Sequence, residues 1–393
     1  QMNETVYIVN GARTPMGGLQ GCFSSISAVE LGSAAIEETL NRSCIEKKEV
    51  QEVIMGCVLP GGLRQGPARQ AAIQAGIPVE TGASTINKLC GSGMKATMLG
   101  FDSIKAGSNQ LVITGGMESM SNAPYLLPKA RQGLRMGHGE IQDSMFTDGL
   151  EDASSARLMG SFAQEVADEY QLTRESMDEF AITSLSKAKA AIENQSLAPE
   201  IVPITVKTRQ GQTVITEDEQ PGNAQIDKIP KLKPAFKDGG TVTAANSSSI
   251  SDGASAMLLA SETAVKTFSL NPMAKICAHS TNSMEPSKFT LAPIGAIENI
   301  LEITGWEKSE VDLFEINEAF AMVTMLATKE LDLDPSKVNI HGGACAQGHP
   351  IGSTGSRIII SLMYALKKTG GKKGIAALCI GGGEATAVAL ELV

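Results

Sequence analysis

Short apolar runs alternate with amphipathic stretches through the first 120 residues of the chain. Residues 6–9, 53–55 and 111–113 are apolar runs of strand length, and we expect Gly115 to end the third strand. Residues 94–104 place methionine, phenylalanine and isoleucine on one face of a predicted helix. This alternation is typical of an α/β fold, in which helices cover the faces of a sheet.

The last third of the chain repeats this order. Residues 313–316 and 375–380 predict strands, the second of which runs into a glycine turn, and residues 358–366 predict a helix. A glycine-rich turn, a helix, an apolar strand and a Gly-Gly pair occur around residues 91–116 and again around residues 352–383. We interpret this as an internal duplication of a doubly wound α/β unit; the alternative is a chance match between two ordinary α/β segments.

Residues 120–250 interrupt the alternation. They begin with a polar, methionine-rich stretch and continue with helices, the clearest of which begins after Thr173. Lysines and arginines follow between residues 207 and 237. We interpret the segment as an insertion that covers one face of the core, whereas the alternative for its basic residues is an ordinary solvated surface.

Composition narrows the classes of protein to consider. The chain has 393 residues, of which 42% are hydrophobic and 19% charged, so it is long enough for two or three folded units and is not of the disordered type. Its net charge of −10 argues against a general nucleic-acid-binding protein. No apolar run approaches the roughly 18 residues of a membrane helix, and no signal or transit peptide is visible. We therefore expect a cytoplasmic protein with no membrane partner.

The chain holds seven cysteines and four histidines. The cysteine count is odd, no Cys-x-x-Cys pair occurs, and the histidines show no ligand spacing, so we expect neither a disulfide framework nor a metal site. Free thiols remain, and the question is which of them react.

Cys90 is the first candidate. It stands at the predicted start of a helix, between a predicted strand and a Gly-Ser-Gly sequence. The free N–H groups and the dipole of a helix N-terminus favour an anion, so we expect the thiol pKa to be lowered there. The alternative is a small buried cysteine at a tight turn.

His349 stands before Pro-Ile-Gly at the start of the second predicted helix, the place that Cys90 occupies in the other repeat. A histidine there can accept the thiol proton and later hydrogen-bond an oxyanion. A satisfied core histidine is the alternative.

Two further sites lie at strand ends. Cys379 precedes a glycine turn and is a candidate acid or base, with the Gly381 N–H as an oxyanion donor; a core cysteine beside turn glycines is the alternative. Asn317 follows a strand and precedes a helix, so it either caps the helix or positions a water or substrate oxygen.

Together these motifs resemble the thiolase family, most closely its biosynthetic, short-chain type. The four active-site motifs occur in order: Asn-x-x-Cys-Gly-Ser-Gly around Cys90, Asn-Glu-Ala-Phe at 317–320, Gly-His-Pro-Ile-Gly at 348–352 and Cys-Ile-Gly-Gly-Gly at 379–383. Three further family motifs lie at residues 11–15, 115–121 and 240–244.

The resemblance implies a fold of two duplicated, five-layered α/β/α/β/α halves with an inserted loop domain. Residues 1–119 together with 249–271 would form the N-terminal half, residues 120–248 the loop domain, and residues 272–393 the C-terminal half. It also implies a homo-oligomer, either a dimer or a tetramer.

The implied activity is the reversible Claisen condensation of two acetyl-CoA molecules to acetoacetyl-CoA and CoA. Cys90 would carry the acetyl group, His349 would activate it, and Cys379 would remove the α-proton of the second acetyl-CoA. Asn317 would hold a water in one oxyanion hole beside His349, and the N–H groups of Cys90 and Gly381 would form the other.

The resemblance further implies that the loop domain binds coenzyme A, as a substrate and not as a permanently bound cofactor. Ser248 would lie near the pantetheine. The other positions carried over from the family are Leu158, Met159, Ala244, Ala319 and Phe320.

Two alternatives stay open. One is a degradative 3-ketoacyl-CoA thiolase with a broader range of chain lengths. The other is a catalytically silent, thiolase-like subunit that binds CoA. It is suggested by Gly222, where an arginine is common, and by Leu158-Met159, where many short-chain members have a histidine. Glu384 also departs from the family pattern.

Overall fold

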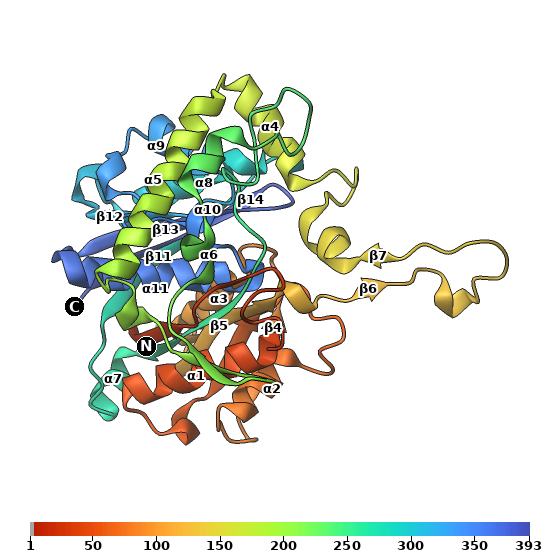
Figure 1. The fold of residues 1–393 in the computed structure, drawn as a ribbon. Coiled ribbons are helices and arrows are strands. Elements are labelled where there is room, and N and C mark those ends of the chain that lie inside the picture. The colour runs from red at the N-terminus through yellow and green to blue at the C-terminus, as the bar shows by residue number, and fades with distance from the viewer. Residues whose placement is uncertain (1–3) are drawn as a thin grey trace.

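The computed structural model describes residues 4–393 and is organised around one large mixed sheet (Figure 1). Ten strands pair in the order β12-β13-β14-β11-β1-β10-β5-β3-β4, with β2 beside β10. The strands are β1 (Val6–Arg13), β2 (Gly17–Gly18), β3 (Glu52–Gly56), β4 (Gly82–Ile86), β5 (Leu111–Ser119), β10 (Ser251–Ser261), β11 (Ala274–Ser283), β12 (Leu313–Ile316), β13 (Lys373–Ile380) and β14 (Glu384–Leu392).

The pairing of the strands confirms the duplication. From β1, the strands β10, β5 and β3 follow with antiparallel, antiparallel and parallel pairing. From β11, the strands β14, β13 and β12 follow with the same three senses. A parallel bridge from Phe314 to Val338 stands where β4 pairs with β3 in the first half. The antiparallel pair β1–β11 joins the two halves.

Helices form the layers that were expected. The helices α3 and α11 pack against each other between the two half-sheets, while α1 and α2 cover the outer face of the first half and α8 that of the second. The helices of the core are α1 (Ala28–Ser43), α2 (Pro67–Gln74), α3 (Ser92–Lys105), α7 (Glu262–Thr267), α8 (Ala292–Thr304), α9 (Ala321–Glu330), α10 (Ala344–Gln347) and α11 (Ile351–Thr369).

The expectation that Gly115 ends a strand is wrong, because β5 continues to Ser119. The glycines serve close packing instead. A Cβ atom on Gly116 would lie 1.8 Å from the carbonyl oxygen of Gly352, and one on Gly115 would lie 2.1 Å from that of Ser255. Only glycine lets the first turn of α11 approach β5 this closely.

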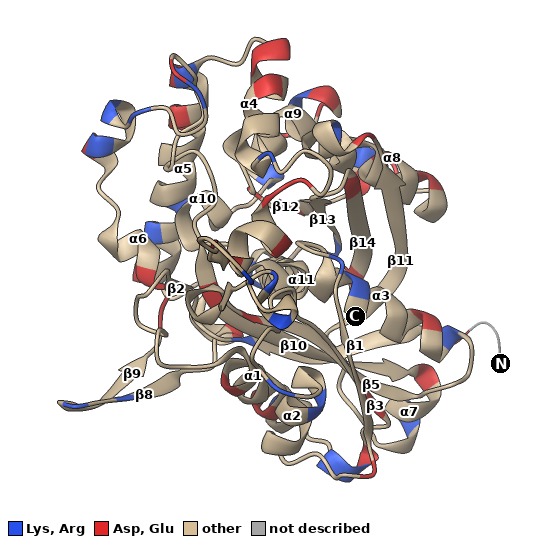
Figure 2. Ribbon diagram, turned by 90° about the vertical axis from the view of Figure 1, so that its right-hand side faces the viewer, with Lys and Arg blue, Asp and Glu red and all other residues tan. Residues whose placement is uncertain are grey.

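The segment between β5 and β10 holds the helices α4 (Met159–Glu169), α5 (Arg174–Glu193) and α6 (Glu219–Asn223). It also holds two hairpins, β6 (Tyr125–Leu126) with β7 (Gln142–Asp143) and β8 (Ile204–Thr208) with β9 (Gly211–Ile215). The β6–β7 hairpin extends away from the body of the molecule (Figure 1). The β8–β9 hairpin also projects, and basic residues lie near its tip (Figure 2). Within residues 4–393, no helix is both long and apolar enough to cross a membrane.

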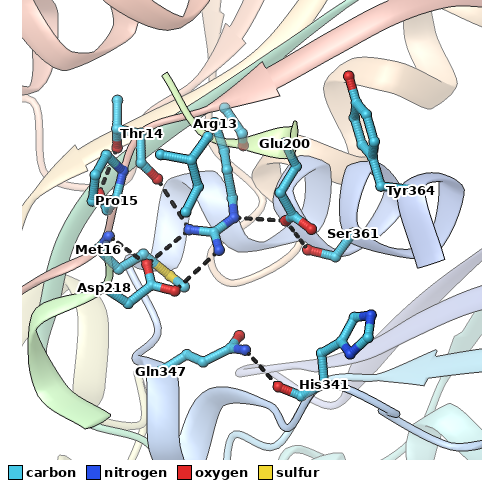
Figure 3. A network of polar contacts seen from close by, with 12 residues as sticks. Arg13, Thr14, Pro15, Met16, Glu200, Asp218, His341, Gln347, Ser361 and Tyr364 are labelled. Atoms are coloured by element: carbon cyan, nitrogen blue, oxygen red, sulfur yellow. Dashed lines mark hydrogen bonds and ion pairs between the residues drawn. The ribbon is translucent and has the colours of Figure 1, made fainter. Parts of the chain in front are cut away.

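A buried ion cluster fastens this segment to the core (Figure 3). The guanidinium of Arg13, at the end of β1, is inaccessible to solvent. Its Nε donates to Glu200 Oε2 at 2.7 Å, and its two terminal nitrogens donate to the carboxylate of Asp218 at 2.8 and 3.0 Å. Ser361 of α11 donates to the same Glu200 oxygen at 2.6 Å. This ion cluster therefore joins the inserted segment to both β1 and α11.

Candidate active site

Cys90 lies two residues before α3, as predicted. The turn that presents it is held by Ser92, whose hydroxyl donates to Leu89 O at 2.7 Å and accepts from Lys88 N–H at 2.8 Å. Leu89 has a φ of 50°, in the left-handed region, so the backbone bends sharply just before the cysteine. The Cys90 side chain keeps part of its surface accessible.

His349 lies two residues before α11, which confirms that it shares its place in the repeat with Cys90. Its ring is buried, and Nδ1 is 2.6 Å from Thr354 Oγ1. Its Nε2 has no hydrogen-bond partner among residues 4–393. Ile250, which is bridged to His349, and Ile351 pack in the same apolar cluster as Cys90, so the two candidate residues share one region.

Cys379 and Gly381, from the C-terminal half, lie close to Cys90. The N–H of Gly381 faces the Cys90 sulfur. A Cβ on Gly91 would lie 2.3 Å from Ile380 Cδ1, which shows how closely the two loops approach. Cys379 itself is buried, and burial together with the neighbouring Cys90 raises its pKa well above the ordinary thiol value. Two thiols from opposite ends of the chain therefore lie near each other.

The expected lowering of the Cys90 pKa is wrong for this structure. Burial raises the pKa of the thiol to about 11, while the N–H groups of Gly381 and of Cys90 act in the opposite direction. The cost of removing a thiolate from water exceeds the stabilisation that these N–H groups provide. The thiol at rest is therefore protonated and requires a base.

His349 is the candidate for that base because its Nε2 has no partner among residues 4–393 and its ring is neutral. Burial, aided by the Arg357 cation, lowers the pKa of its imidazole to about 3. A neutral ring at physiological pH has one unprotonated nitrogen that can accept a proton.

Asn317 is not a helix cap. The helix α9 begins at Ala321, and its N-cap is Phe320. The backbone N–H of Asn317 donates to Ala377 O at 3.0 Å, but neither Oδ1 nor Nδ2 of its buried side chain has a partner among residues 4–393. A buried amide without protein partners is a site for an ordered water or a substrate oxygen.

The segment before β10 connects the Asn317 loop to His349. Ser247 is bridged to Phe320 and Ile250 to His349, and the Ser248 N–H donates to Ala319 O at 2.8 Å. The residues carried over as CoA contacts thus lie beside the candidate catalytic loops.

Three of the carried-over CoA positions pack near Cys379. Met159, Ala319 and Phe320 pack in one apolar cluster with Cys379, and Leu158 is the N-cap of α4, directly before Met159. Ala244 lines an adjoining cleft of about 380 Å³ together with Lys228.

Glu118 is a functional candidate that the sequence analysis missed. Its buried carboxylate accepts N–H groups from Val58 at 3.0 Å, Leu59 at 3.1 Å and Gly352 at 2.9 Å. It therefore connects the loop after β3 with the first turn of α11. The available signal was an acidic residue at the end of an otherwise apolar strand.

Glu318 has a similar role on the other side of the site. It is buried and accepts from the Ser184 hydroxyl at 2.7 Å, the Asn339 amide at 2.9 Å and the Cys345 N–H at 3.3 Å. These contacts tie α5, the Asn317 loop and the loop before His349 together. No group of three or more histidine, cysteine, aspartate or glutamate side chains in residues 4–393 is arranged as a metal site.

Comparison with known proteins gives matches along the whole chain. The family Thiolase, N-terminal domain, matches residues 6–263, and Thiolase, C-terminal domain, matches residues 270–392. An acetyl-CoA acetyltransferase of Schizosaccharomyces pombe is 46% identical, with all of both chains covered. Acetyl-CoA acetyltransferase 2 of Arabidopsis thaliana is 47% identical over 99% of this chain and 97% of its own.

Two solved structures are also similar to this chain over nearly its whole length. The crystal structure of the Bacillus anthracis acetyl-CoA acetyltransferase has a TM-score of 0.97 and 40% identity, with 99% of each chain covered. The Acat5 thiolase from Ascaris suum, in complex with coenzyme A, has a TM-score of 0.94 and 39% identity over 99% of this chain and 100% of its own. The fold is that of the thiolases, and the chain belongs to the thiolase family.

Proposed function

We propose that this protein is an acetyl-CoA C-acetyltransferase, which condenses two acetyl-CoA molecules to acetoacetyl-CoA and CoA and runs the reverse thiolysis. Relatives with that name match the chain over its whole length. The observation that carries the mechanism is the meeting of two thiols, Cys90 and Cys379, with a neutral histidine in the same region.

In the first half-reaction, His349 Nε2 takes the proton of Cys90, and the thiolate attacks the acetyl carbonyl of acetyl-CoA. The N–H groups of Cys90 and Gly381, both facing the sulfur, hold the oxyanion. The bond from carbon to the CoA sulfur then breaks, and Cys379 gives its proton to the departing sulfur. Acetyl-Cys90, an imidazolium and a Cys379 thiolate remain.

In the second half-reaction, the Cys379 thiolate removes an α-proton from a second acetyl-CoA. Its raised pKa makes it a strong base, which the weakly acidic methyl group requires. The enolate oxygen is held by the His349 Nε2–H and by a water on the Asn317 amide. The new carbon–carbon bond forms at acetyl-Cys90, the carbon–sulfur bond breaks, and the Cys90 sulfur regains its proton from His349.

The CoA portion of each substrate lies between the inserted segment and the C-terminal half. Met159, Ala319 and Phe320 supply apolar walls beside Cys379. Lys228 lines the same cleft as Ala244 and supplies a cation for the phosphates.

We also propose a homo-oligomer in a reducing, cytoplasmic location. Strand β4 is the edge of the sheet, its side chains are exposed or half-buried, and its free backbone edge suits pairing with a second copy. The seven cysteines, all within residues 4–393, form no disulfide there, which suits a reducing compartment. Light scattering on the full chain tests the assembly, and a monomer at micromolar concentration contradicts it.

Substrate comparison tests the function. Thiolysis of acetoacetyl-CoA should proceed faster than that of a longer 3-ketoacyl-CoA, and Cys90→Ala should abolish turnover in both directions. Clear preference for the longer substrate would favour the degradative alternative. No turnover by the wild-type chain with either substrate would favour the silent subunit.

A further inference from the structure

Thr354 makes the closest polar contact to His349. It is the fourth residue of α11, and its Oγ1 lies 2.6 Å from His349 Nδ1. The same hydroxyl donates to Pro350 O at 3.1 Å. Both side chains are buried, so no bulk water competes for this contact.

A hydroxyl has one proton, and Thr354 donates that proton to the Pro350 carbonyl oxygen. The Thr354 oxygen is then free to accept the Nδ1–H of His349. This fixes the tautomer in which Nε2 carries the lone pair, and Nε2 is the ring nitrogen without a partner among residues 4–393. In the opposite tautomer, Nε2 would already hold a proton and could not accept one from Cys90.

The arrangement also serves the charged state. When His349 takes the thiol proton, Nδ1–H remains a donor and Thr354 remains its acceptor. The Arg357 cation opposes that charge, so the ring depends on a fixed acceptor. The other hydroxyls near this end of α11 are engaged elsewhere, because Ser353 and Ser356 contact Ser255 at 2.8 and 2.6 Å.

We infer that Thr354 is a positioning residue, which holds His349 as the Nδ1–H tautomer so that Nε2 can accept the Cys90 proton. This inference rests on the proposed role of His349. It adds a third member to the Cys90–His349 pair, with a neutral hydroxyl where a carboxylate commonly orients a histidine.

The variants Thr354→Val, Thr354→Ser and His349→Ala test it. Valine keeps the shape and removes the acceptor, so kcat should fall about 10- to 100-fold, the range typical when a metal-binding histidine loses its orienting partner. The KM for acetoacetyl-CoA should stay within about twofold, because the hydroxyl binds no substrate. Serine should restore most of kcat. Thr39→Val is the matched control, since its buried hydroxyl contacts Ala35 O at 2.8 Å and Ala256 O at 3.0 Å and no candidate catalytic residue.

Nitrogen NMR of the histidine-labelled, full-length wild type provides a readout that needs no variant. His349 should show a protonated Nδ1 and an unprotonated Nε2, and a protonated Nε2 at rest would overturn the inference even if Thr354→Val failed to fold. A Thr354→Val enzyme with full kcat, beside an inactive His349→Ala, would refute the Thr354 role and leave the proposed function intact. An active His349→Ala would instead refute the proposed role of the histidine.

Discussion

The Cys90 sulfur faces two backbone N–H groups, yet the surrounding protein keeps its thiol protonated at rest, with a pKa raised to about 11. In the proposed mechanism, reactivity at neutral pH therefore comes from proton transfer to His349 during the attack and not from a standing thiolate. This separates the site from cysteines that are activated by a helix terminus alone.

The rate of alkylation reports the protonation state of the Cys90 thiol. The rate of Cys90 modification by iodoacetamide in a His349→Ala variant should rise about tenfold per pH unit between about pH 7 and 10, because only the thiolate reacts. Mass spectrometry of the labelled peptides gives the rate, with the exposed Cys44 as an internal reference. A plateau below about pH 8 would show a thiolate at neutral pH.

Glu118 makes stability depend on pH. Burial raises the pKa of its carboxyl from 4.5 to about 7. A carboxyl with a raised folded-state pKa contributes stability that is complete below its unfolded pKa and is lost as pH rises through the folded value. The free energy of unfolding should therefore fall between about pH 5 and 7 in the wild type more steeply than in Glu118→Gln.

Urea unfolding at several pH values checks this, with the exposed Glu330→Gln as the matched control. Parallel pH dependences of Glu118→Gln and the wild type would show that Glu118 does not titrate there.

Among the elements, the two repeats carry different functional side chains at equivalent strand positions. Gly56 pairs with Gly116 in the first half, and Ile316 pairs with Ala377 in the second. Two residues further along, β5 carries Glu118 and β13 carries Cys379. The duplicated unit thus supplies a structural carboxylate in one half and a candidate base in the other.

Close packing of α11 on β5 should tolerate no side chain at Gly116. Gly116→Ala should destabilise the protein by roughly 1–3 kcal/mol or more, because overpacking against backbone displaces the helix. Its Cβ would lie 1.8 Å from Gly352 O, whereas Gly222→Ala has no atom within 4 Å and serves as the control. Thermal unfolding of both variants tests this expectation, and equal unfolding midpoints for Gly116→Ala and Gly222→Ala would contradict this packing.

The local pattern of hydrophobic and polar residues predicted the positions of some elements closely. Residues 313–316 form β12 as expected, and the expected places of Cys90 and His349 before their helices are confirmed. The end of β5 and the pKa of Cys90 were mispredicted, since both depend on what packs against them from distant parts of the chain. Glu118 and Glu318 were missed for the same reason: nothing local shows which backbone groups they bind.

For the whole molecule, the buried cation of Arg13 contributes to the attachment of the inserted segment. Arg13→Met would leave the carboxylates of Glu200 and Asp218 buried without their partner. Loss of one member of a buried ion pair typically costs about 3–5 kcal/mol. We expect a loss of that size in urea unfolding, together with faster proteolysis within residues 120–250. The exposed pair of Lys48 and Glu46 gives the control Lys48→Met, which should unfold like the wild type.

The division of labour between the two thiols is the central claim, and the fate of the acetyl group in Cys379→Ala tests it most directly. CoA leaves readily as a thiolate, so this variant should still take up one acetyl group from acetyl-CoA, on Cys90, and should form no acetoacetyl-CoA. Intact-protein mass spectrometry with peptide mapping locates the group. An acetyl group on another residue, or condensation by Cys379→Ala at the wild-type rate, would contradict the account.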